Sequence, residues 1–472
     1  MTESLDPSLP SVLSDLQKQL GPQAVLFGQD IPERNRNDWS SQAPTEPIAV
    51  IRPMDAQQVS LALKACAQAG LKVVPQGGLT GLCGGARPED GWVALSMERM
   101  VGVQEIDAAS STMTVWAGTP LEAIQQAADN AGLFFSLDLG ARGSCAIGGN
   151  LSTNAGGNRV IRYGMARELV LGLEVVLPDG TIVTSLNKML KNNAGYDLKQ
   201  LFIGSEGTLG VITRVVLRLH PKPQCTMAAL CAVKDFDALV GLLKAARAGL
   251  GPTLSAFEVM WPDYWHVVTQ RAHVKAAVGA GHGQYVLIEA QGVDELSDPP
   301  RFQAWLESIL NQGLLADAAV AQSLADVKGF WALRDACAEF FQVIGPHISY
   351  DVAMPVGRMN EFVDRCKTGL LALPHGGVHS IYYGHVGDGN LHLVAWAEGV
   401  SLLAQPKEAM DAVIYGLVKE CGGSISAEHG IGTQKKKWLG FSRSPEEIAL
   451  MQTLKKALDP TNMLNPGKVV SV

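Results

Sequence analysis

Glycine is concentrated in three clusters in the first half of the chain, and this uneven distribution constrains the fold more than any other feature. The clusters lie at residues 77–85, 140–164 and 204–210, whereas segment 223–374 has fewer glycines and long stretches with a helical amphipathic pattern. Glycine loops expose consecutive backbone N–H groups, which suits an anionic ligand such as a pyrophosphate. We expect a loop-rich ligand-binding domain followed by a domain of another kind.

The first cluster follows a strand–helix–strand pattern. We expect strands at 49–53 and 72–75 and a helix at 56–69 that ends at Gly70. Segment 75–85 contains neither a Gly-x-Gly-x-x-Gly motif that opens a helix nor a Walker lysine, which argues against a Rossmann or P-loop site. Taken alone, this loop is better explained as a glycine-rich turn that binds no ligand.

Chain length predicts more than one domain, because 472 residues are too many for a single core. A strand is expected at 210–219, and prolines at 221 and 223 interrupt it. We therefore place a domain boundary close to residue 222.

Charge and composition exclude several classes of protein. The net charge is −8, and the lysines and arginines are scattered apart from a run at 435–437, so no nucleic-acid surface is expected. We expect the run to be a solvated face. No apolar segment is long enough to cross a bilayer, and the acidic N-terminus is unlike a secretory signal. The eight cysteines form no Cys-x-x-Cys pair, which favours reduced thiols and a cytoplasmic location.

A histidine pair flanks a glycine turn near the C-terminus. If Val386 pairs with Leu391 across the turn 387–390, then His385 and His392 lie directly opposite each other. Opposed side chains share one face of a hairpin, with Cβ atoms roughly 5 Å apart. The pair is compatible with a divalent metal site, but also with a structural hydrogen-bonded pair.

The segment that begins at Glu428 supplies further groups of the same chemistry. Its carboxylate would complete three protein ligands with the two histidines and leave a position for substrate. The adjacent His429 would then act as a base.

These motifs together resemble a known flavoprotein superfamily. The three glycine clusters, with segments 191–197 and 465–468, resemble the flavin domain of the vanillyl-alcohol-oxidase-type (PCMH-type) FAD superfamily. The motifs at 385–392 and 428–429 resemble its D-2-hydroxy acid dehydrogenase branch, which includes D-2-hydroxyglutarate and D-lactate dehydrogenases. The resemblance covers roughly residues 37–468.

The resemblance implies an α+β fold with an antiparallel-sheet cap. It predicts a two-part PCMH-type FAD-binding domain at 1–222, a substrate- and metal-binding cap domain at 223–443, and a segment at 444–472 that returns to the FAD domain. The first glycine loop contains no histidine, so we expect non-covalent FAD. Ile212 is expected near the adenine or ribityl end. The predicted FAD-binding residues are Pro75, Gln76, Gly77, Gly78, Leu79, Thr80, Gly81, Leu82, Gly140, Gly143, Ser144, Gly148, Gly149, Asn150, Thr153, Asn154, Gly157, Gly207, Ile212 and Asn465.

The resemblance also assigns roles at the reacting centre. His385, His392 and Glu428 would hold Zn²⁺ or Mn²⁺, and His429 would take the hydroxyl proton while hydride passes to flavin N5. Arg334 would bind the substrate carboxylate and act in catalysis. The further predicted substrate contacts are Ser349, Tyr196 and Asn390, of which Asn390 is also predicted to be catalytic.

Two positions depart from the members that select a five-carbon diacid. Those members carry a lysine where this chain has Ser349 and a threonine where it has Ala338. A second carboxylate would lose its cationic partner, which argues against D-2-hydroxyglutarate and leaves D-lactate or another D-2-hydroxy acid open. His347 is an alternative source of charge.

The expected activity is therefore a D-2-hydroxy acid dehydrogenase that passes electrons to a quinone, a cytochrome or an electron-transfer flavoprotein rather than to NAD. One alternative is an oxidase that uses O₂. Another is a flavin-binding accessory subunit of a glycolate-oxidase-like complex. A homodimer is expected.

Overall fold

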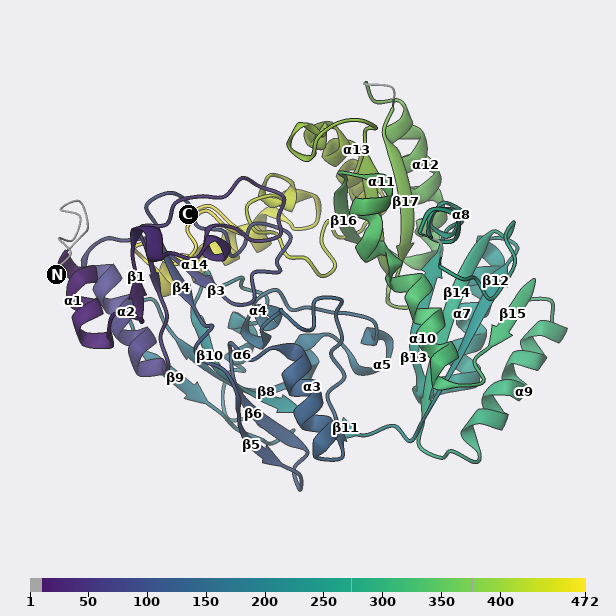
Figure 1. The fold of residues 1–472 in the computed structure, drawn as a ribbon, viewed down its shortest axis with the longest axis horizontal. Coiled ribbons are helices and arrows are strands. Elements are labelled where there is room, and N and C mark those ends of the chain that lie inside the picture. Colours follow the sequence, from purple (N-terminus) through teal and green to yellow (C-terminus); the bar gives the residue numbers. More distant parts are fainter. Residues whose placement is uncertain (1–10, 273, 375–376) are drawn as a thin grey trace.

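The molecule has two lobes that lie side by side (Figure 1). The computed structural model describes residues 11–272, 274–374 and 377–472. The purple-to-blue lobe contains the N-terminal elements, and the teal-to-green lobe contains the long strands that follow. The yellow C-terminal segment, with α14 (Pro445–Leu458), lies beside the first lobe. This α+β architecture agrees with the expected fold class.

Two larger sheets form most of the first lobe, together with a two-stranded pair of β7 (Leu133–Phe134) and β11 (His220–Pro221). One has the order β1–β2–β4–β3, in which β4 runs parallel to both β2 and β3. The other is antiparallel, with the order β5–β6–β10–β8–β9. The strands are β1 (Val25–Leu26), β2 (Ala49–Ile51), β3 (Val73–Gln76), β4 (Val93–Ser96), β5 (Val103–Asp107), β6 (Thr112–Trp116), β8 (Val170–Val176), β9 (Ile182–Ser185) and β10 (Val211–Arg218).

The elements expected around the first glycine cluster are present. The structure has β2 and β3 where strands were predicted, and α2 (Ala56–Gln68) between them. The helix begins after Asp55 because the Asp55 side chain accepts a hydrogen bond from the backbone N–H of Gln58. The chain then enters the glycine loop directly from the end of β3, which fixes the start of that loop on the sheet.

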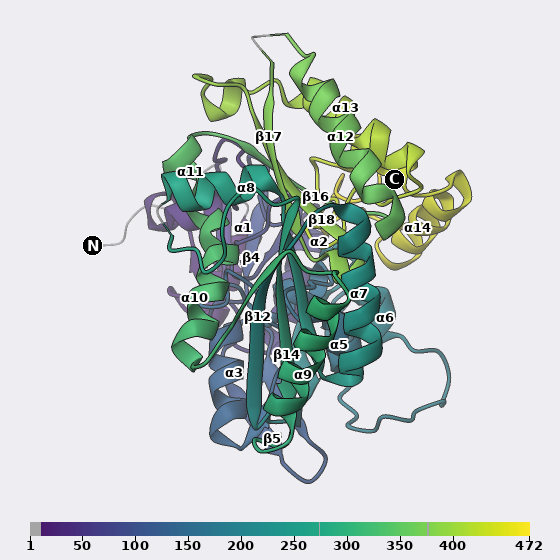
Figure 2. The ribbon, with the colours of Figure 1, turned by 90° about the vertical axis from the view of Figure 1, so that its right-hand side faces the viewer.

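The second lobe is built on one antiparallel sheet with the order β15–β12–β14–β13–β17–β18–β16. Helices cover both faces of this sheet (Figure 2). The strands are β12 (Cys225–Val233), β13 (Leu254–Met260), β14 (Gln284–Gly292), β15 (Asp317–Val320), β16 (Ile348–Ala353), β17 (His379–Gly384) and β18 (Asn390–Trp396). The main helices are α7 (Phe236–Leu250), α9 (Asp298–Asn311), α10 (Leu324–Asp335), α12 (Met359–Leu371) and α13 (Lys407–Glu420).

The sequence of β12 explains why both faces are covered. Its apolar run is continuous, and alternate side chains of a strand point to opposite faces. Ala229 and Cys231 pack into the core that contains α7, α9, α12 and α13. Ala228 and Leu230 pack into the core on the other face, which contains α10. A strand that is apolar on both sides can be buried only between two layers.

The C-terminal segment is tied to the first lobe by buried polar contacts. Lys455 Nζ donates to the carbonyl of Thr208 at 2.8 Å. Asn465 Nδ2 donates to the carbonyls of Gly85 at 3.1 Å and Glu206 at 2.7 Å. These contacts support the predicted return of segment 444–472, and we keep the division of the chain at 222 and 443 as a proposal.

We predict that Gly432→Ala destabilises the contact between the loop that follows His429 and the first glycine loop. Gly432 has φ +51°, and an added Cβ would lie 1.9 Å from the carbonyl oxygen of Cys83. The expected loss is about 2 kcal/mol or more in the free energy of unfolding, from backbone strain and overpacking. Thermal unfolding followed by circular dichroism measures it. The matched control is Gly440→Ala, because no atom lies within 4 Å of the added Cβ; equal midpoints for the two variants would contradict the prediction.

Candidate active site

The histidine pair meets, but not in the predicted register. His392 of β18 pairs with Tyr383 of β17, and His385 lies beyond the end of β17, before the 3₁₀ turn Val386–Asp388. The expected pairing of residues 386 and 391 across a four-residue turn is therefore wrong. The connection is longer, because Val386 enters the core and Gly389 closes the turn with φ +91°. The two imidazole rings still converge, with centroids 5.0 Å apart.

Glu428 completes a group with the donor set of a metal site. One ligand atom each from His385, His392 and Glu428 lie within 4.8 Å of one another. Two imidazoles and one carboxylate are typical ligands of Zn²⁺ and also suit Mn²⁺. Glu428 Oε1 accepts a hydrogen bond from the backbone N–H of Gly157. A Cβ at Gly156 would lie 2.2 Å from the same oxygen, so this part of the second glycine cluster must be small for Glu428 to approach.

Glu258 of β13 orients His385. Its Oε1 lies 2.6 Å from His385 Nδ1, and its Oε2 accepts from Arg334 Nε at 2.8 Å. Burial alone would lower the pKa of His385, but the Glu258 carboxylate raises it to about 9. Since Nδ1 donates to Glu258, Nε2 is the nitrogen directed at the cluster, the arrangement by which a carboxylate orients a ligand histidine.

Asp351 of β16 joins the two halves of the site. Its Oδ2 accepts hydrogen bonds from the backbone N–H groups of Ala427, Glu428 and His429 at 3.0, 2.7 and 2.9 Å. Its Oδ1 accepts from Asn390 Nδ2 at 2.7 Å. Burial alone raises the pKa of Asp351, but the nearby histidines and the N–H donors hold it below its usual range. The ionised carboxylate thus fixes segment 427–429 against the sheet.

His429 is placed to accept a proton. Its ring lies beside that of His392, with centroids 6.2 Å apart and an angle of 21° between the planes. Burial lowers the pKa of His429 to about 4, with Asp351 raising it and Lys435 lowering it. The imidazole is therefore neutral near pH 7, and the adjacent Asp351 would stabilise the protonated ring.

The glycine clusters enclose a cavity of about 630 Å³ that Glu428 and His429 also line. An added Cβ at Gly78 would lie 2.2 Å from the carbonyl oxygen of Ser144, so two clusters approach each other backbone to backbone. Asn150 Oδ1 is buried and has no hydrogen-bond partner among the described residues, which leaves it for a ligand. The predicted FAD-binding residues that line the cavity are Pro75, Gln76, Gly77, Gly78, Leu79, Thr80, Gly81, Leu82, Gly140, Gly148, Gly149, Asn150, Thr153, Gly207 and Ile212.

The other predicted FAD-binding residues lie outside the lining of this cavity. Gly143 and Ser144 are exposed on the second cluster. Asn154 Oδ1 accepts from the backbone N–H of Arg167. The backbone N–H of Gly157 donates to Glu428 Oε1. Asn465 donates to the carbonyls of Gly85 and Glu206 in the first lobe. These five therefore shape the loops rather than line the space between them.

The predicted substrate residues fall in different places. Arg334 is 8% exposed, and Nη2 lies 3.2 Å from His385 Nε2, so it belongs to the cluster. Asn390 is also buried there, with Oδ1 unpartnered among the described side chains. Ser349 lines a neighbouring cavity. Tyr196 is 94% exposed on a loop that borders a separate pocket, and the structure does not bring it to the cluster.

Sequence reasoning missed the carboxylates that hold the site together. Glu258 and Asp351 were not predicted as site residues, although each is a lone acid in a buried apolar strand, which signals a buried partner. The solvated face expected at 435–437 is wrong for Lys435, which is 4% exposed and directs Nζ to the carbonyl of Asp351 at 3.4 Å. Lys437 of the same run is exposed.

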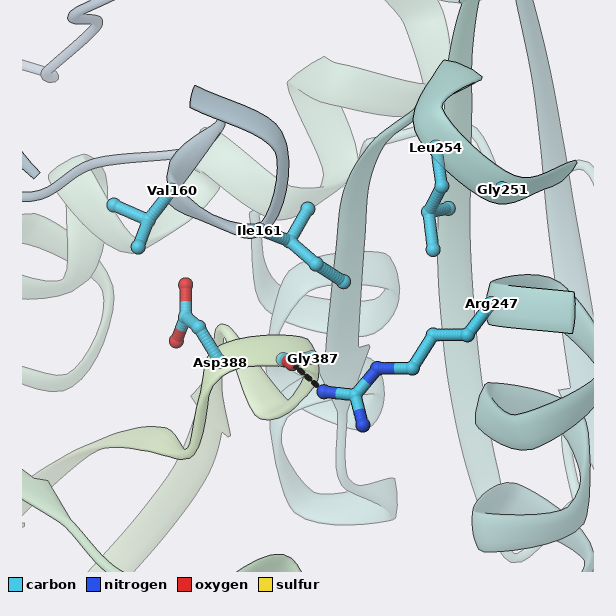
Figure 3. A pocket seen from close by; sticks show the side chains of 7 residues that line it. All are labelled: Val160, Ile161, Arg247, Gly251, Leu254, Gly387 and Asp388. Carbon is cyan, nitrogen blue, oxygen red and sulfur yellow. Dashed lines mark hydrogen bonds between the residues drawn. The ribbon is translucent and has the colours of Figure 1, made fainter. Parts of the chain in front are cut away.

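A pocket of about 350 Å³ lies against the turn that follows His385 (Figure 3). In it, Arg247 of α7 donates from Nη2 to the carbonyl of Gly387 at 2.6 Å. A Cβ at Gly387 would lie 2.7 Å from Ile161 Cδ1 and 3.0 Å from Phe257 Cβ. The turn that follows His385 is therefore held by contacts from α7, β13 and the second glycine cluster.

We predict that Glu258→Gln weakens metal binding by about 10- to 100-fold, because outer carboxylates contribute that much to metal affinity. The amide keeps the shape but no longer balances the buried Arg334 or orients His385. Metal titration followed by calorimetry measures the change. Glu289→Gln is the matched control, since Glu289 is also 1% exposed and paired with an arginine, Arg159. Equal affinities for wild type and Glu258→Gln would contradict the role.

The cavity of glycine loops and the second lobe beside it point to one class of protein, the FAD-dependent oxidoreductases. Comparisons with known proteins identify the family. Residues 222–469 match the model of FAD linked oxidases, C-terminal domain, and residues 47–185 match an FAD binding domain. The chain belongs to the FAD-linked oxidase family, which confirms the resemblance.

Curated relatives cover nearly the whole chain. D-2-hydroxyglutarate dehydrogenase, mitochondrial, from Bos taurus is 40% identical over 95% of this chain and 81% of the relative. D-2-hydroxyglutarate dehydrogenase from Xanthomonas citri is 38% identical over 93% of this chain and 92% of the relative. A putative D-lactate dehydrogenase, mitochondrial, from Schizosaccharomyces pombe is 36% identical over 92% and 84%.

Solved structures share the fold at low identity. Substrate-bound p-cresol methylhydroxylase has a TM-score of 0.78 and 16% identity over 98% of this chain and 96% of its own. A 4-ethylphenol oxidase from Gulosibacter chungangensis has a TM-score of 0.76 and 18% identity over 99% of each chain. Across the described residues, the helices are all too short or too polar to cross a membrane.

Proposed function

We propose that this protein oxidises a D-2-hydroxy acid to the 2-oxo acid with FAD and a divalent metal ion. The observation that carries the proposal is that His385, His392 and Glu428 converge beside His429, while Glu428 and His429 also line the glycine-loop cavity. A substrate bound at the cluster would therefore face the FAD. The names of the curated relatives support the substrate class.

The residues of the cluster would bind the metal ion, bind the substrate carboxylate and accept a proton. His385, His392 and Glu428 would hold Zn²⁺ or Mn²⁺, which when bound lowers the pKa of the substrate hydroxyl. Arg334 would bind the substrate carboxylate through Nη1 and Nη2, of which Nη2 also lies 3.2 Å from His385 Nε2. His429 would accept the hydroxyl proton as the C2–O bond becomes a carbonyl.

The glycine loops would hold FAD, which when bound supplies the acceptor for the hydride from C2. Segment 75–85 contains no histidine, so the attachment is expected to be non-covalent. Both electrons of the C2–H bond leave with the hydride, and the reduced cofactor would pass them to a quinone, a cytochrome or an electron-transfer flavoprotein. The acceptor, the homodimer and the cytoplasmic location stay predictions.

Anaerobic mixing tests the proposal. The FAD- and metal-loaded protein is mixed with D-lactate, D-2-hydroxyglutarate and their L enantiomers, and the absorbance of oxidised flavin is followed. Loss of that absorbance with a D acid alone would support it. No loss with these or with bulkier D-2-hydroxy acids, or equal loss with L acids, would contradict it. Stoichiometric peroxide in air would identify an oxidase, and activity only within a complex would identify an accessory subunit.

A further inference from the structure

A second cavity opens beside the reacting centre. It measures about 910 Å³, and Trp39, Leu82 and Ala338 line both this cavity and the glycine-loop cavity that contains His429. The two cavities therefore share part of their walls. The second cavity is large enough to hold a sizeable part of a small molecule.

Two residues that line this cavity are close in sequence to residues of the cluster. Ala338 comes four residues after Arg334, about one helical turn along the chain. Ser349 comes two residues before Asp351 on β16, so the two side chains point to the same face of the sheet. A group attached to a substrate between Arg334 and Asp351 would extend toward Ala338 and Ser349.

The charges in this cavity are already paired with each other. Lys407 Nζ lies 2.7 Å from Asp411 Oδ2, and Lys437 contacts Glu408. Burial lowers the pKa of His347, which leaves that ring neutral near pH 7. A second carboxylate would therefore compete with Asp411 and Glu408 for the two lysines of the lining. An uncharged substituent meets no such competition.

The uncharged part of the lining combines serine and glutamine side chains with large, accessible apolar ones. Trp39 is 56% exposed, Phe341 57% and Leu403 75%. Aromatic and aliphatic side chains around a cavity favour an apolar ligand, because its binding removes their apolar surface from water.

We propose that the second cavity binds the substituent at C2, and that the preferred substrates are D-2-hydroxy acids with a bulky, uncharged, apolar side chain. The inference rests on the proposed function and narrows its substrate class. Branched aliphatic and aromatic side chains fill the space beside Phe341, whereas the methyl group of D-lactate leaves most of it unused.

A substrate series tests this inference. The FAD- and metal-loaded protein is assayed with an artificial electron acceptor and D-lactate, D-2-hydroxyglutarate, D-2-hydroxy-4-methylpentanoate and D-3-phenyllactate. We expect kcat/KM for the last two to exceed that for the first two by about tenfold or more, the scale of discrimination by one or two methylenes in an apolar pocket. Equal or higher kcat/KM for D-2-hydroxyglutarate or D-lactate would overturn the inference.

Variants separate charge from size. Ser349→Lys adds a cation to the wall and is expected to raise the ratio of kcat/KM for D-2-hydroxyglutarate over D-2-hydroxy-4-methylpentanoate by about tenfold. Ser349→Met is the matched control of similar length without charge, and an equal rise there would overturn the reasoning. Phe341→Ala should lower the ratio for D-3-phenyllactate over D-lactate; a change confined to the KM of the acceptor would instead assign the cavity to that acceptor and overturn the inference.

The two proposals fail in different ways. If no D-2-hydroxy acid in the series reduces the flavin, both the proposed function and the inference are contradicted. If D-lactate or D-2-hydroxyglutarate reduces the flavin and the bulky acids do not do so faster, the function stands and only the inference fails.

Discussion

His429→Ala is expected to leave FAD bound and to slow flavin reduction by substrate by about 10²- to 10⁴-fold, the usual contribution of a general base. In the proposed function the neutral ring of His429 would take the hydroxyl proton, and the nearby Asp351 would stabilise the imidazolium. Without that acceptor the proton has to leave to water while hydride departs from C2. Anaerobic stopped-flow mixing with the best D acid measures the rate of flavin reduction.

The control for this variant is His379→Ala. His379 lies on β17 of the same lobe, but its side chain is 47% exposed and faces Glu398. Both variants should retain the wild-type flavin content and thermal unfolding midpoint. If flavin is reduced in His429→Ala at a rate within a few-fold of that in His379→Ala, the proposed role of His429 as the base is contradicted.

Removal of the metal is expected to produce a loss of similar size. A bound cation stabilises the charge that develops on the substrate oxygen in the transition state by several kcal/mol. Each reduction of about 1.4 kcal/mol in the activation free energy corresponds to a tenfold increase in rate. Dialysis against a chelator should therefore lower kcat by roughly a hundredfold or more while FAD stays bound. Readdition of Zn²⁺ or Mn²⁺ should restore activity, and elemental analysis gives the metal content.

His392→Ala makes this test specific to the cluster. It removes one of the three predicted ligands, so both the metal content and the gain in rate on metal addition should fall. His347→Ala is the control, since His347 lines the second cavity and not the ligand group. Full metal content in His392→Ala, or full activity in the chelated wild type, would exclude the metal site.

The local elements of the first lobe follow from the sequence because their causes are local. A capping aspartate starts α2, and the apolar runs of β2, β3 and β10 are complete within a few residues. The histidines and the glutamate were also predicted as a group from residue type and spacing, and the structure brings His385, His392 and Glu428 together. Their roles in metal binding and proton transfer stay predictions. The resemblance then supplied FAD, which the family match confirms.

The register of the histidine hairpin shows where local reasoning stops. A tight turn at 387–390 is favoured by its Asp-Gly pair alone. In the folded chain Val386 is buried in the core of the second lobe, and Arg247 holds the carbonyl of Gly387. Burial of one side chain and one long-range hydrogen bond outweigh the preference of a four-residue turn.

The sequence by itself determined the glycine loops, the apolar strands and the types of side chain that can bind metal and move a proton. The tertiary structure decided which of these meet. Glu258 orients His385 across 127 residues, and Asp351 holds the N–H groups of residues 427–429 across more than 75. Tyr196, by contrast, stays exposed on its loop. Contacts of this kind depend on how whole sheets pack, because a buried charge is stable only where distant parts of the chain bring it a partner.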